Sequence, residues 1–488
     1  MSATTPRPAS ADAHQADRAQ GEQPDGAPAE LSSSPGGVFD PAYALVSLAL
    51  VALITVIAFE GMAVSTAMPA AARELDAVRS YGLAFSVMLT TQLLGIVLAG
   101  VWCDRSGPLP SLYLGQALFA VGCGVCGSAT GFGVFLAGRG VAGLGAGLII
   151  VAGYVVIGRA YPESLRPKVF SVISAAWVLP SLLGPPISAW VTTTFSWRWV
   201  FWLVVVPVIV AMVAVVARRG QIRAADAGVE ASGRDHRAHA RAAWSGVLIA
   251  ASAGALQWGT HDLELQWSVQ GVVALVGVAG VAATAPLLLP RGTWLMRRGL
   301  PSVMVSRFLL TCSFFGTITY IPLMLVNERG LSLGAAGTIL AVGSLGWSAG
   351  SWVQGRDRWS GRRHRLVSVG GALLTGGLLT VVAVTHFGWN PYLVAVALVA
   401  CGTGMGLGTA SLSVLSLMLT APADHGSTSS SLQLADVLGS VLGIAAAGAV
   451  FAALHTTAGQ DVPVYVAMWL GLSAVSALVV VAGRRIHT

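Results

Sequence analysis

Residues 42–69 read AYALVSLALVALITVIAFEGMAVSTAMP, an apolar stretch with a single charged residue, Glu60. An α-helix needs about 20 apolar residues to cross roughly 30 Å of hydrocarbon, so this stretch predicts a membrane-spanning helix. A carboxylate in hydrocarbon is costly unless it is paired, protonated or facing water. Glu60 is therefore a candidate functional residue. The alternative is that Glu60 only anchors helix packing through hydrogen bonds.

The composition extends this interpretation to the whole chain. Of the 488 residues, 55% are hydrophobic and 10% are charged, whereas a soluble domain carries about 25% charged residues. We therefore expect an all-α polytopic membrane protein embedded in a lipid bilayer. No basic patch interleaved with aromatic residues lies outside the apolar runs, so we expect no nucleic-acid partner. Lys168 is the only lysine among the 28 basic residues, which indicates a GC-rich bacterial genome.

The apolar runs form a block of six, a central pair and a second block of six. The fourteen runs cover about 42–69, 82–103, 111–130, 133–157, 168–193, 198–217, 244–260, 268–290, 303–326, 333–354, 366–386, 391–420, 427–455 and 463–483. The two blocks suggest a repeat, with substrate handled near the midplane between them. The run at 244–260 is short and contains Gln257, so the alternative is twelve spans with a re-entrant middle segment.

This pattern predicts seven parts along the chain. We expect a disordered cytoplasmic tail because the first residues are rich in Ala, Pro, Ser, Asp and Gln and have no apolar run. The parts are the tail 1–41, a six-helix bundle 42–217, a cytoplasmic linker 218–243, an inserted hairpin 244–290, a connector 291–302, a second six-helix bundle 303–483 and a tail 484–488.

The basic residues predict the orientation. If the N-terminus is cytoplasmic, most of the 28 Lys and Arg residues fall in cytoplasmic segments, and Arg307 is counted there. Arg139 lies within a helix, and the outer segments hold only Arg73, Arg79, Arg198 and Arg329. This bias follows the positive-inside rule and places both termini in the cytoplasm. Loss of one span of the central pair would reverse the second half, so both span or neither does.

Arg139 is a candidate partner for Glu60. At 1.5 Å per residue, Glu60 lies roughly 13 Å from the outer end of its helix and Arg139 roughly 9 Å from the outer end of its own. The two charges therefore lie at similar depths and can pair if the helices adjoin. Separation of the pair would favour protonation of Glu60, and reunion would favour proton release. The alternative is a static ion pair that fixes helix packing.

Asp436 is the other acid well inside an apolar run, roughly 13 Å from the cytoplasmic end of its helix. It is a candidate to carry a second proton, to bind a cationic substrate or to cap a neighbouring backbone. We find no metal-ligand cluster, no phosphate-binding G-x-x-x-x-G-K-[ST] motif and no nucleophile–base set in the sequence. We therefore expect neither an enzyme nor a metal site.

Several motifs occur in a family-specific order and spacing. They are Glu60 to Pro69, the loop motif Gly100, Asp104, Arg105 and Gly107, Arg139 with Gly140, Gly143 and Gly147, the stretch Leu183-Gly184-Pro185-Pro186, and Trp197-Arg198-Trp199-Val200-Phe201. With these motifs the chain resembles the fourteen-helix drug:proton antiporters of the major facilitator superfamily over about residues 42–485. It departs from the pattern at Pro108-Leu109-Pro110, where basic residues are usual, and at Ser188-Ala189, where glycines are usual.

The resemblance implies a proton-coupled exporter of amphipathic, cationic drug-like compounds in the bacterial cytoplasmic membrane, with a contribution to antibiotic resistance. It implies coupling through Glu60, Arg139 and Asp436, a gating motif at residues 100–107 and an antiporter motif at Gly184 and Pro185. It also implies a cavity between the two halves, with candidate lining residues Gln92, Trp177, Tyr320 and Trp347. The proton is the expected coupling ion, no cofactor is expected, and the chain is expected to be a monomer. The alternatives are a dedicated exporter of one metabolite, antibiotic or lipid, and a membrane sensor or scaffold that transports nothing.

Overall fold

The computed structural model describes the chain from Phe39 to Ile486, with several gaps. The gaps are residue 42, residues 163–175 except Leu165, Val169 and Val172, and residues 228–235, 261–268, 291, 360, 421–424 and 457–458. Nearly all of the predicted tail 1–41 lies outside the described residues. In some helices, including α9, further side chains are also outside the description.

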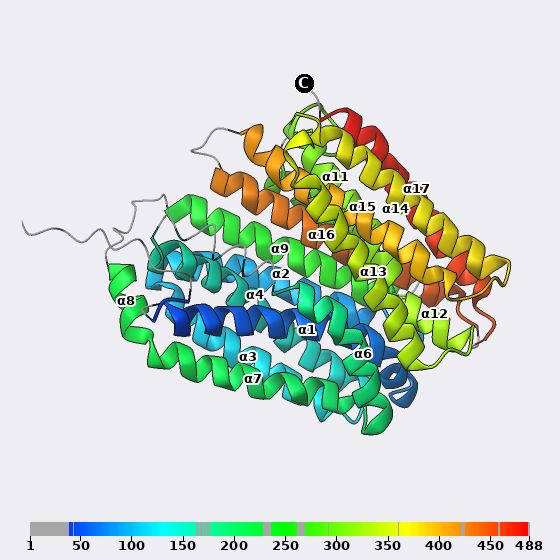
Figure 1. Cartoon of the computed structure of the whole chain (residues 1–488), viewed down its shortest axis with the longest axis horizontal. Coiled ribbons are helices and arrows are strands. Elements are labelled where there is room, and N and C mark those ends of the chain that lie inside the picture. The colour runs from blue at the N-terminus through cyan, green and yellow to red at the C-terminus, as the bar shows by residue number, and fades with distance from the viewer. Residues whose placement is uncertain are drawn as a thin grey trace, which may run out of the picture. The chain divides into compact units, whose positions relative to one another are not determined.

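The described residues form helices and no strand. The helices, seen in Figure 1, are α1 Ala44–Glu74, α2 Leu83–Ser106, α3 Pro108–Gly127, α4 Phe132–Ala160, α6 Val178–Thr194, α7 Arg198–Ala217, α8 Arg219–Ala227, α9 His236–Thr260, α10 Val269–Leu288, α11 Leu300–Ile318, α12 Ile321–Asn327, α13 Leu333–Gln354, η1 Asp357–Trp359, α14 Arg363–His386, α15 Leu393–Met418, α16 His425–Leu454 and α17 Val462–Arg484. The prediction of an all-α polytopic membrane protein is confirmed.

Twelve candidate membrane spans, by length and composition, occur among the described residues. The predicted runs 168–193 and 244–260 correspond to α6 and α9. Helix α6 has 17 residues, and the side chains of α9 are described only from Trp244 to Gly259. Neither α6 nor α9 is among the twelve candidate spans, so the count of fourteen stays a prediction.

Two segments differ in detail from the sequence expectation. The predicted linker 218–243 contains α8 and the first turns of α9, because Ala, Arg and Gln in RGQIRAADA favour a helix. Ile222 on α8 is buried against the first helices, which ties that segment to the bundle.

The predicted run 303–326 is divided into α11 and α12. Pro322 lies in the first turn of α12, where it is tolerated. A continuous helix would instead lose the backbone hydrogen bond of Pro322 and bring its ring against the carbonyl of Ile318. The chain therefore breaks at Thr319 and Tyr320.

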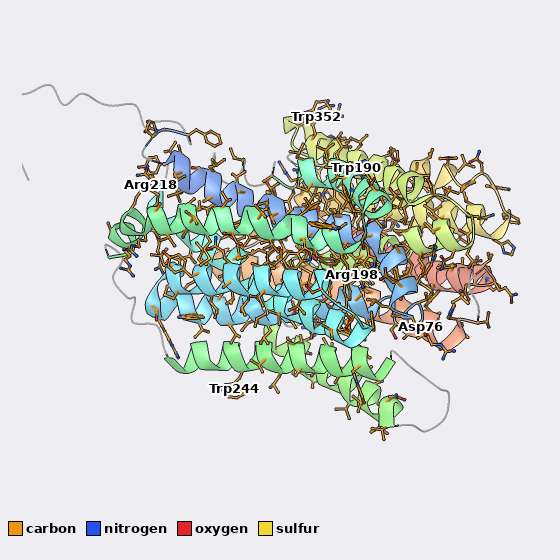
Figure 2. The ribbon with its side chains drawn as sticks, turned by 90° about the horizontal axis from the view of Figure 1, so that it is seen from below. Asp76, Trp190, Arg198, Arg218, Trp244 and Trp352 are labelled. Atoms are coloured by element: carbon orange, nitrogen blue, oxygen red, sulfur yellow. The ribbon has the colours of Figure 1, made fainter. Side chains whose placement is uncertain are left out.

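The helices before and after the central hairpin share a large apolar core at one end. At the end where α1 finishes and α2 begins, a single cluster of buried residues joins α1, α2, α6 and α7 to α12, α13, α16 and α17. The remaining large clusters are separate. One contains residues of α1, α2, α3, α4, α7 and α8, and the other contains residues of α11, α14, α15, α16 and α17. Figure 2 shows Asp76 and Arg198 toward one end of the helices and Arg218 at the other.

The central hairpin joins α9 to α10, and α9 also contacts both α2 and α16. In Figure 1, α9 lies between these two helices. A small apolar cluster contains Leu93 on α2, Ile249 on α9 and Leu438 on α16. Gln257 of α9 donates a hydrogen bond of 2.6 Å to Thr90 on α2. The hairpin therefore packs against both blocks of helices.

Candidate functional site

Glu60 on α1 and Arg139 on α4 form a buried ion pair. Arg139 Nη1 donates to Glu60 Oε1, and the two residues are 2% and 1% exposed. Arg139 Nε also donates to the carbonyl of Ala84 on α2, at 2.9 Å. The second carboxylate oxygen of Glu60, Oε2, is buried and has no hydrogen-bond partner among the described residues. One guanidinium thus ties three helices together and leaves one acceptor of Glu60 unused.

The glycines of α4 bring its neighbours close enough for this contact. A Cβ on Gly143 would lie closer than 3.0 Å to the backbone of Met88 on α2, and a Cβ on Gly138 would do the same at Cys126 on α3. Such separations are essentially never seen for real Cβ atoms. The helices can therefore approach only because these positions lack a side chain, as is common in membrane bundles.

Asp436 also has a basic partner, Arg307, which we expected to lie in a cytoplasmic segment. Arg307 Nε donates to Asp436 Oδ1 at 2.6 Å, and Arg307 Nη1 donates to the carbonyl of Thr409 at 2.9 Å. Arg307 was counted among the cytoplasmic segments, but it lies about two turns into α11. That assignment was wrong, because Arg307 lies inside the apolar run itself. Its position in the run could have identified it as a charged residue within the membrane.

The gating motif lies at the junction of α2 and α3. Gly107 has a φ of 75°, a left-handed conformation that favours glycine, and Pro108 follows at the start of α3. Arg105 is exposed, the side chain of Asp104 lies outside the described residues, and a Cβ on Gly100 would meet open space. The structure explains Gly107 by the tight turn, and the gating role stays a prediction.

The antiporter motif lies where α6 passes between α1 and α13. A Cβ on Gly184 would be 3.5 Å from the Cβ of Met62, and Ser188 Oγ donates to the carbonyl of Ala63 at 2.6 Å. On the other side, a Cβ on Gly337 of α13 would lie 2.9 Å from the carbonyl oxygen of Pro185. Gly184 therefore packs against α1 in its own block, and Pro185 stands at a contact between the two blocks of helices.

The four candidate cavity residues differ in their surroundings, and their shared role in a cavity stays a prediction. Tyr320 is fully buried among aromatic rings, with Tyr81 and Phe451 at centroid distances of 5.3 and 5.2 Å. Trp347 is half-buried and packs edge-on against Phe314. Gln92 is half-buried on α2, and Trp177 is 39% exposed just before α6. In this conformation Tyr320 belongs to the aromatic core, since neighbouring rings cover it.

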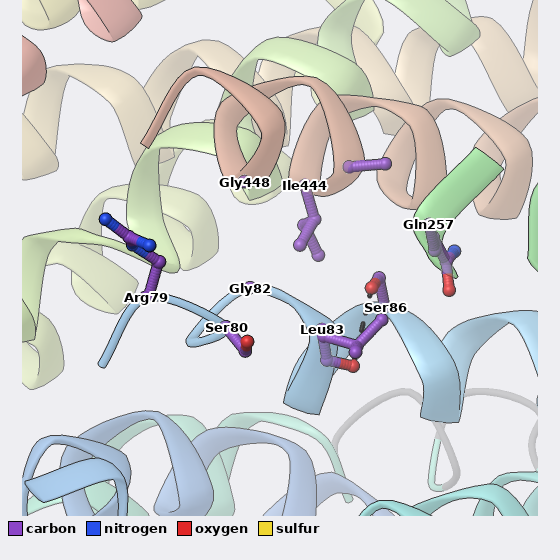
Figure 3. A pocket seen from close by; sticks show the side chains of 9 residues that line it. Arg79, Ser80, Gly82, Leu83, Ser86, Gln257, Ile444 and Gly448 are labelled. Carbon is purple, nitrogen blue, oxygen red and sulfur yellow. Dashed lines mark hydrogen bonds between the residues drawn. The ribbon is translucent and has the colours of Figure 1, made fainter. Parts of the chain in front are cut away.

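A small pocket lies beside Tyr320, where α2, α9 and α16 meet. Its lining includes Arg79, Ser86, Gln257, Ile444 and Gly448 (Figure 3). Its volume is about 250 Å³, including the space that opens to solvent. Drug-sized ligands usually occupy about 300–1,000 Å³, so this pocket is too small for a binding cavity of that kind. No cluster of three or more possible metal ligands occurs among the described residues.

The family follows from a sequence match that covers most of the chain. A model of the Major Facilitator Superfamily matches residues 48–444. The chain belongs to the major facilitator superfamily.

Relatives of this major facilitator protein include named drug transporters. It is 24% identical, over 85% of its length and 88% of theirs, to proteins named probable multidrug-efflux transporter in two strains of Mycobacterium tuberculosis. It is 26% identical to a multidrug transporter protein of Bacillus subtilis over 58% of this chain. That second match spans about half of the Bacillus protein, 52% of its length.

Solved structures of the same fold cover nearly the whole chain. A peptide-transporter (POT) family protein in complex with 5-aminolevulinic acid aligns with a TM-score of 0.66 at 14% identity, over 91% of this chain and 96% of that one. A bacterial homologue of the human lysosomal transporter Spinster, in an inward-facing and occupied conformation, aligns with a TM-score of 0.57 at 15% identity, over 92% and 96%. At these identities the likeness concerns the fold.

The contacts of Trp197 and Arg198 explain the motif at residues 197–201. In Trp197-Arg198-Trp199-Val200-Phe201, the Trp197 indole donates to Glu74 Oε2 at 2.7 Å, and Arg198 pairs with Glu74 Oε1 at 2.5 Å. Arg198 also donates to the carbonyl of Ala129 at 2.9 Å and lies 4.4 Å from the Trp197 ring centre. The motif joins the end of α1, the segment after α3 and the start of α7.

Proposed function

We propose that this major facilitator protein is a proton-coupled exporter of amphipathic, cationic compounds that works by alternating access. The relatives named multidrug efflux transporters support a drug exporter. In this proposal the chain spans the cytoplasmic membrane with both termini in the cytoplasm, and the proton is the only coupling agent. The gating and antiporter motifs then stand at the loop and helix contacts that move during transport.

The buried pair of Glu60 and Arg139 is the observation that carries the proposal. A carboxylate that is 1% exposed inside a membrane-spanning helix requires either a cationic partner or a proton. Arg139 supplies the partner through one oxygen, and Glu60 Oε2 has no hydrogen-bond partner among the described residues. Movement of α4 away from α1 would leave Glu60 to take up a proton, and return of Arg139 would displace it.

The packing of the two blocks of helices supports an alternating mechanism. With the orientation that the basic residues predict, the shared core lies at the outer end and the separate cores lie toward the cytoplasm. Such a molecule is closed on the outside. Export then requires the shared outer core to separate while the inner ends come together.

The test is uptake of a fluorescent lipophilic cation into inverted membrane vesicles with an acidic lumen. Wild type should accumulate the cation when the pH gradient is imposed. Glu60→Gln should reduce gradient-driven uptake at least about tenfold, because the neutral amide neither binds nor releases a proton. Substrate binding should persist in that variant. Asp76→Asn is the matched control, because Asp76 is an exposed acid just beyond the same helix.

Equal gradient-driven uptake by wild type and Glu60→Gln would contradict coupling at Glu60. If wild type takes up one compound among many tested, the chain is a dedicated exporter. If it takes up none and binds none, the sensor or scaffold alternative gains support. Comparable expression and unfolding temperature of the two proteins must be established first, since the ion pair also joins three helices.

A further inference from the structure

The second ion pair, Arg307 with Asp436, is only partly buried and so differs from the first in its access to solvent. The side chains of Arg139 and Glu60 are 3% and 1% exposed, whereas those of Arg307 and Asp436 are 12% and 27% exposed. In the second pair the acid is thus the more open member. Exposure lowers the desolvation cost of the carboxylate and leaves part of it open to solvent or to a ligand.

The arginine of this pair is held independently of the acid. Arg307 Nη1 donates to the backbone carbonyl of Thr409 on α15 at 2.9 Å, while Nε donates to Asp436 on α16. If Asp436 changed partner, Arg307 would keep a hydrogen bond to α15. The pair can therefore open without leaving the guanidinium wholly unpaired, which lowers the cost of opening.

An aromatic side chain, Phe308, follows Arg307 on the stretch of α11 that packs against α16. A Cβ on Gly439, one turn from Asp436, would lie closer than 3.0 Å to the backbone of Phe308, so α11 and α16 are in close contact here. The Phe308 ring packs edge-on against Trp294, which is 43% exposed, at 5.1 Å. An acid on α16 with Phe308 and Trp294 on the adjoining segment suits a ligand with a positive charge and a flat or apolar body.

We propose that Asp436 is a binding site for the cationic group of an amphipathic substrate and that Arg307 is its resident counter-ion, which the substrate displaces. The inference rests on the proposed function for the class of substrate. Asp436 lies about three turns into α16, counted from the end that the predicted orientation places in the cytoplasm. This is the side from which an exporter receives its substrate.

Displacement predicts opposite effects for the two members of the pair. Asp436→Asn removes the carboxylate that attracts the cation, so affinity should fall. Arg307→Gln removes the competitor, so affinity should rise. A pair that only holds α11 to α16 predicts the same direction for both variants, because either substitution breaks the same contact.

The experiment is equilibrium binding of radiolabelled tetraphenylphosphonium to the purified full-length chain in lipid nanodiscs, with no pH gradient. Asp436→Asn should weaken binding about tenfold or more, and Arg307→Gln should tighten it by roughly threefold to tenfold. Asp436→Glu should bind within a few-fold of wild type. Arg218→Gln is the control for loss of a positive charge, since Arg218 is exposed at the far end of α7 (Figure 2).

A charge-swapped double variant, Arg307→Asp with Asp436→Arg, guards against misfolding. It restores an ion pair but moves the acid from α16 to α11, so it should fold and bind the cation weakly. Arg307→Gln that weakens binding as much as Asp436→Asn, together with full recovery in the swapped variant, would overturn the inference. Absence of saturable binding to wild type would overturn it as well.

These outcomes are distinct from a failure of proton coupling. The binding measurement uses no gradient and leaves Glu60 intact. Wild type that binds tetraphenylphosphonium with the predicted pattern, yet shows no gradient-driven uptake, would refute the proton-coupled mechanism and leave the cation site standing. Uptake that depends on Glu60, with equal binding in all variants at positions 307 and 436, would refute the site alone.

Discussion

At the scale of single residues, close contact between α2 and α4 depends on a missing side chain. A Cβ on Gly147 would come closer than 3.0 Å to the backbone of Gln92 and Ile96. The same helix carries Arg139, which reaches Ala84 on α2 only at this separation. Gly147 therefore contributes to the position of the ion pair as well as to packing.

We predict that Gly147→Ala destabilises the protein by roughly 1–3 kcal/mol, because the new methyl group has only backbone atoms to displace. The midpoint of thermal unfolding in detergent should fall by several degrees, and gradient-driven uptake should fall with it. Gly158→Ala on the same helix is the control, since a Cβ there meets nothing within 4 Å. It should unfold at the wild-type temperature or slightly above, because Ala favours helix more than Gly.

The candidate site residues were predicted from charged residues that lie inside apolar runs. Glu60, Arg139 and Asp436 stood out because a charge in hydrocarbon is costly. Arg307 carried the same signal and was missed, since it was assigned to the cytoplasmic side by its closeness to the start of the run. The contacts of Arg139 with Ala84 and of Arg307 with Thr409 involve backbone carbonyls, and sequence does not reveal those.

At the scale of elements, a polar cluster fastens α12 to the start of α17. Glu328, just after α12, accepts a hydrogen bond of 2.9 Å from the backbone N–H of Gly459. Asp461 is 1% exposed and pairs with His455 at 2.6 Å, and the His455 ring stacks on Phe451. Burial raises the pKa of Glu328 above its usual value, partly opposed by the Gly459 hydrogen bond and reinforced by nearby Asp461.

A raised pKa of an acid in the folded state gives a definite sign to the pH dependence of stability. The stabilising effect of protonated Glu328 is complete below the ordinary glutamate pKa and is lost as the pH rises through the raised value. We predict that Glu328→Gln unfolds at the wild-type temperature in acid and at a higher temperature than wild type near neutral pH. The measurement is the unfolding midpoint of both proteins across that pH range.

The contrary result would be a constant difference between Glu328→Gln and wild type at every pH. Asp76→Asn serves as a comparison, because Asp76 is an exposed acid in the segment between α1 and α2. The comparison shows how much of the wild-type pH dependence belongs to the rest of the protein. Only the pH dependence of the unfolding midpoint that is lost in Glu328→Gln can be attributed to Glu328 in this cluster.

At the scale of the whole molecule, the two blocks of helices meet through a polar contact as well as through the shared core. Arg73 at the end of α1 donates two hydrogen bonds to Asn327 at the end of α12, at 2.7 and 3.2 Å. Both helices end beside the shared core. In an alternating mechanism this contact must break whenever the outer side opens.

We predict that Cys replacements at Arg73 and Asn327, joined by a short bifunctional maleimide, stop transport. The five native cysteines are buried, so the new thiols should react first. Uptake into inverted vesicles should fall at least about tenfold after cross-linking, because the outer ends can no longer separate. Each single Cys variant should keep its uptake after the same treatment. Full uptake by the cross-linked double variant would show that these ends do not separate during transport.

The sequence by itself determined that the chain is an all-α membrane protein and which charged residues stand out inside its apolar runs. Hydropathy and the cost of a buried charge are local properties, so sequence alone can report them. It also indicated the superfamily through short motifs. It did not show the break at Thr319–Tyr320 or the helix α8, since both depend on turn chemistry and local packing.

Only the tertiary structure decided which charges pair and where the two blocks of helices touch. Glu60 and Arg139 are 79 positions apart, and Arg307 and Asp436 are 129 apart. Whether such residues meet depends on the relative rotation and tilt of whole helices, which the packing of small residues sets. The same packing placed α9 against both blocks and closed one end of the molecule, and neither result follows from the hydropathy of any one segment.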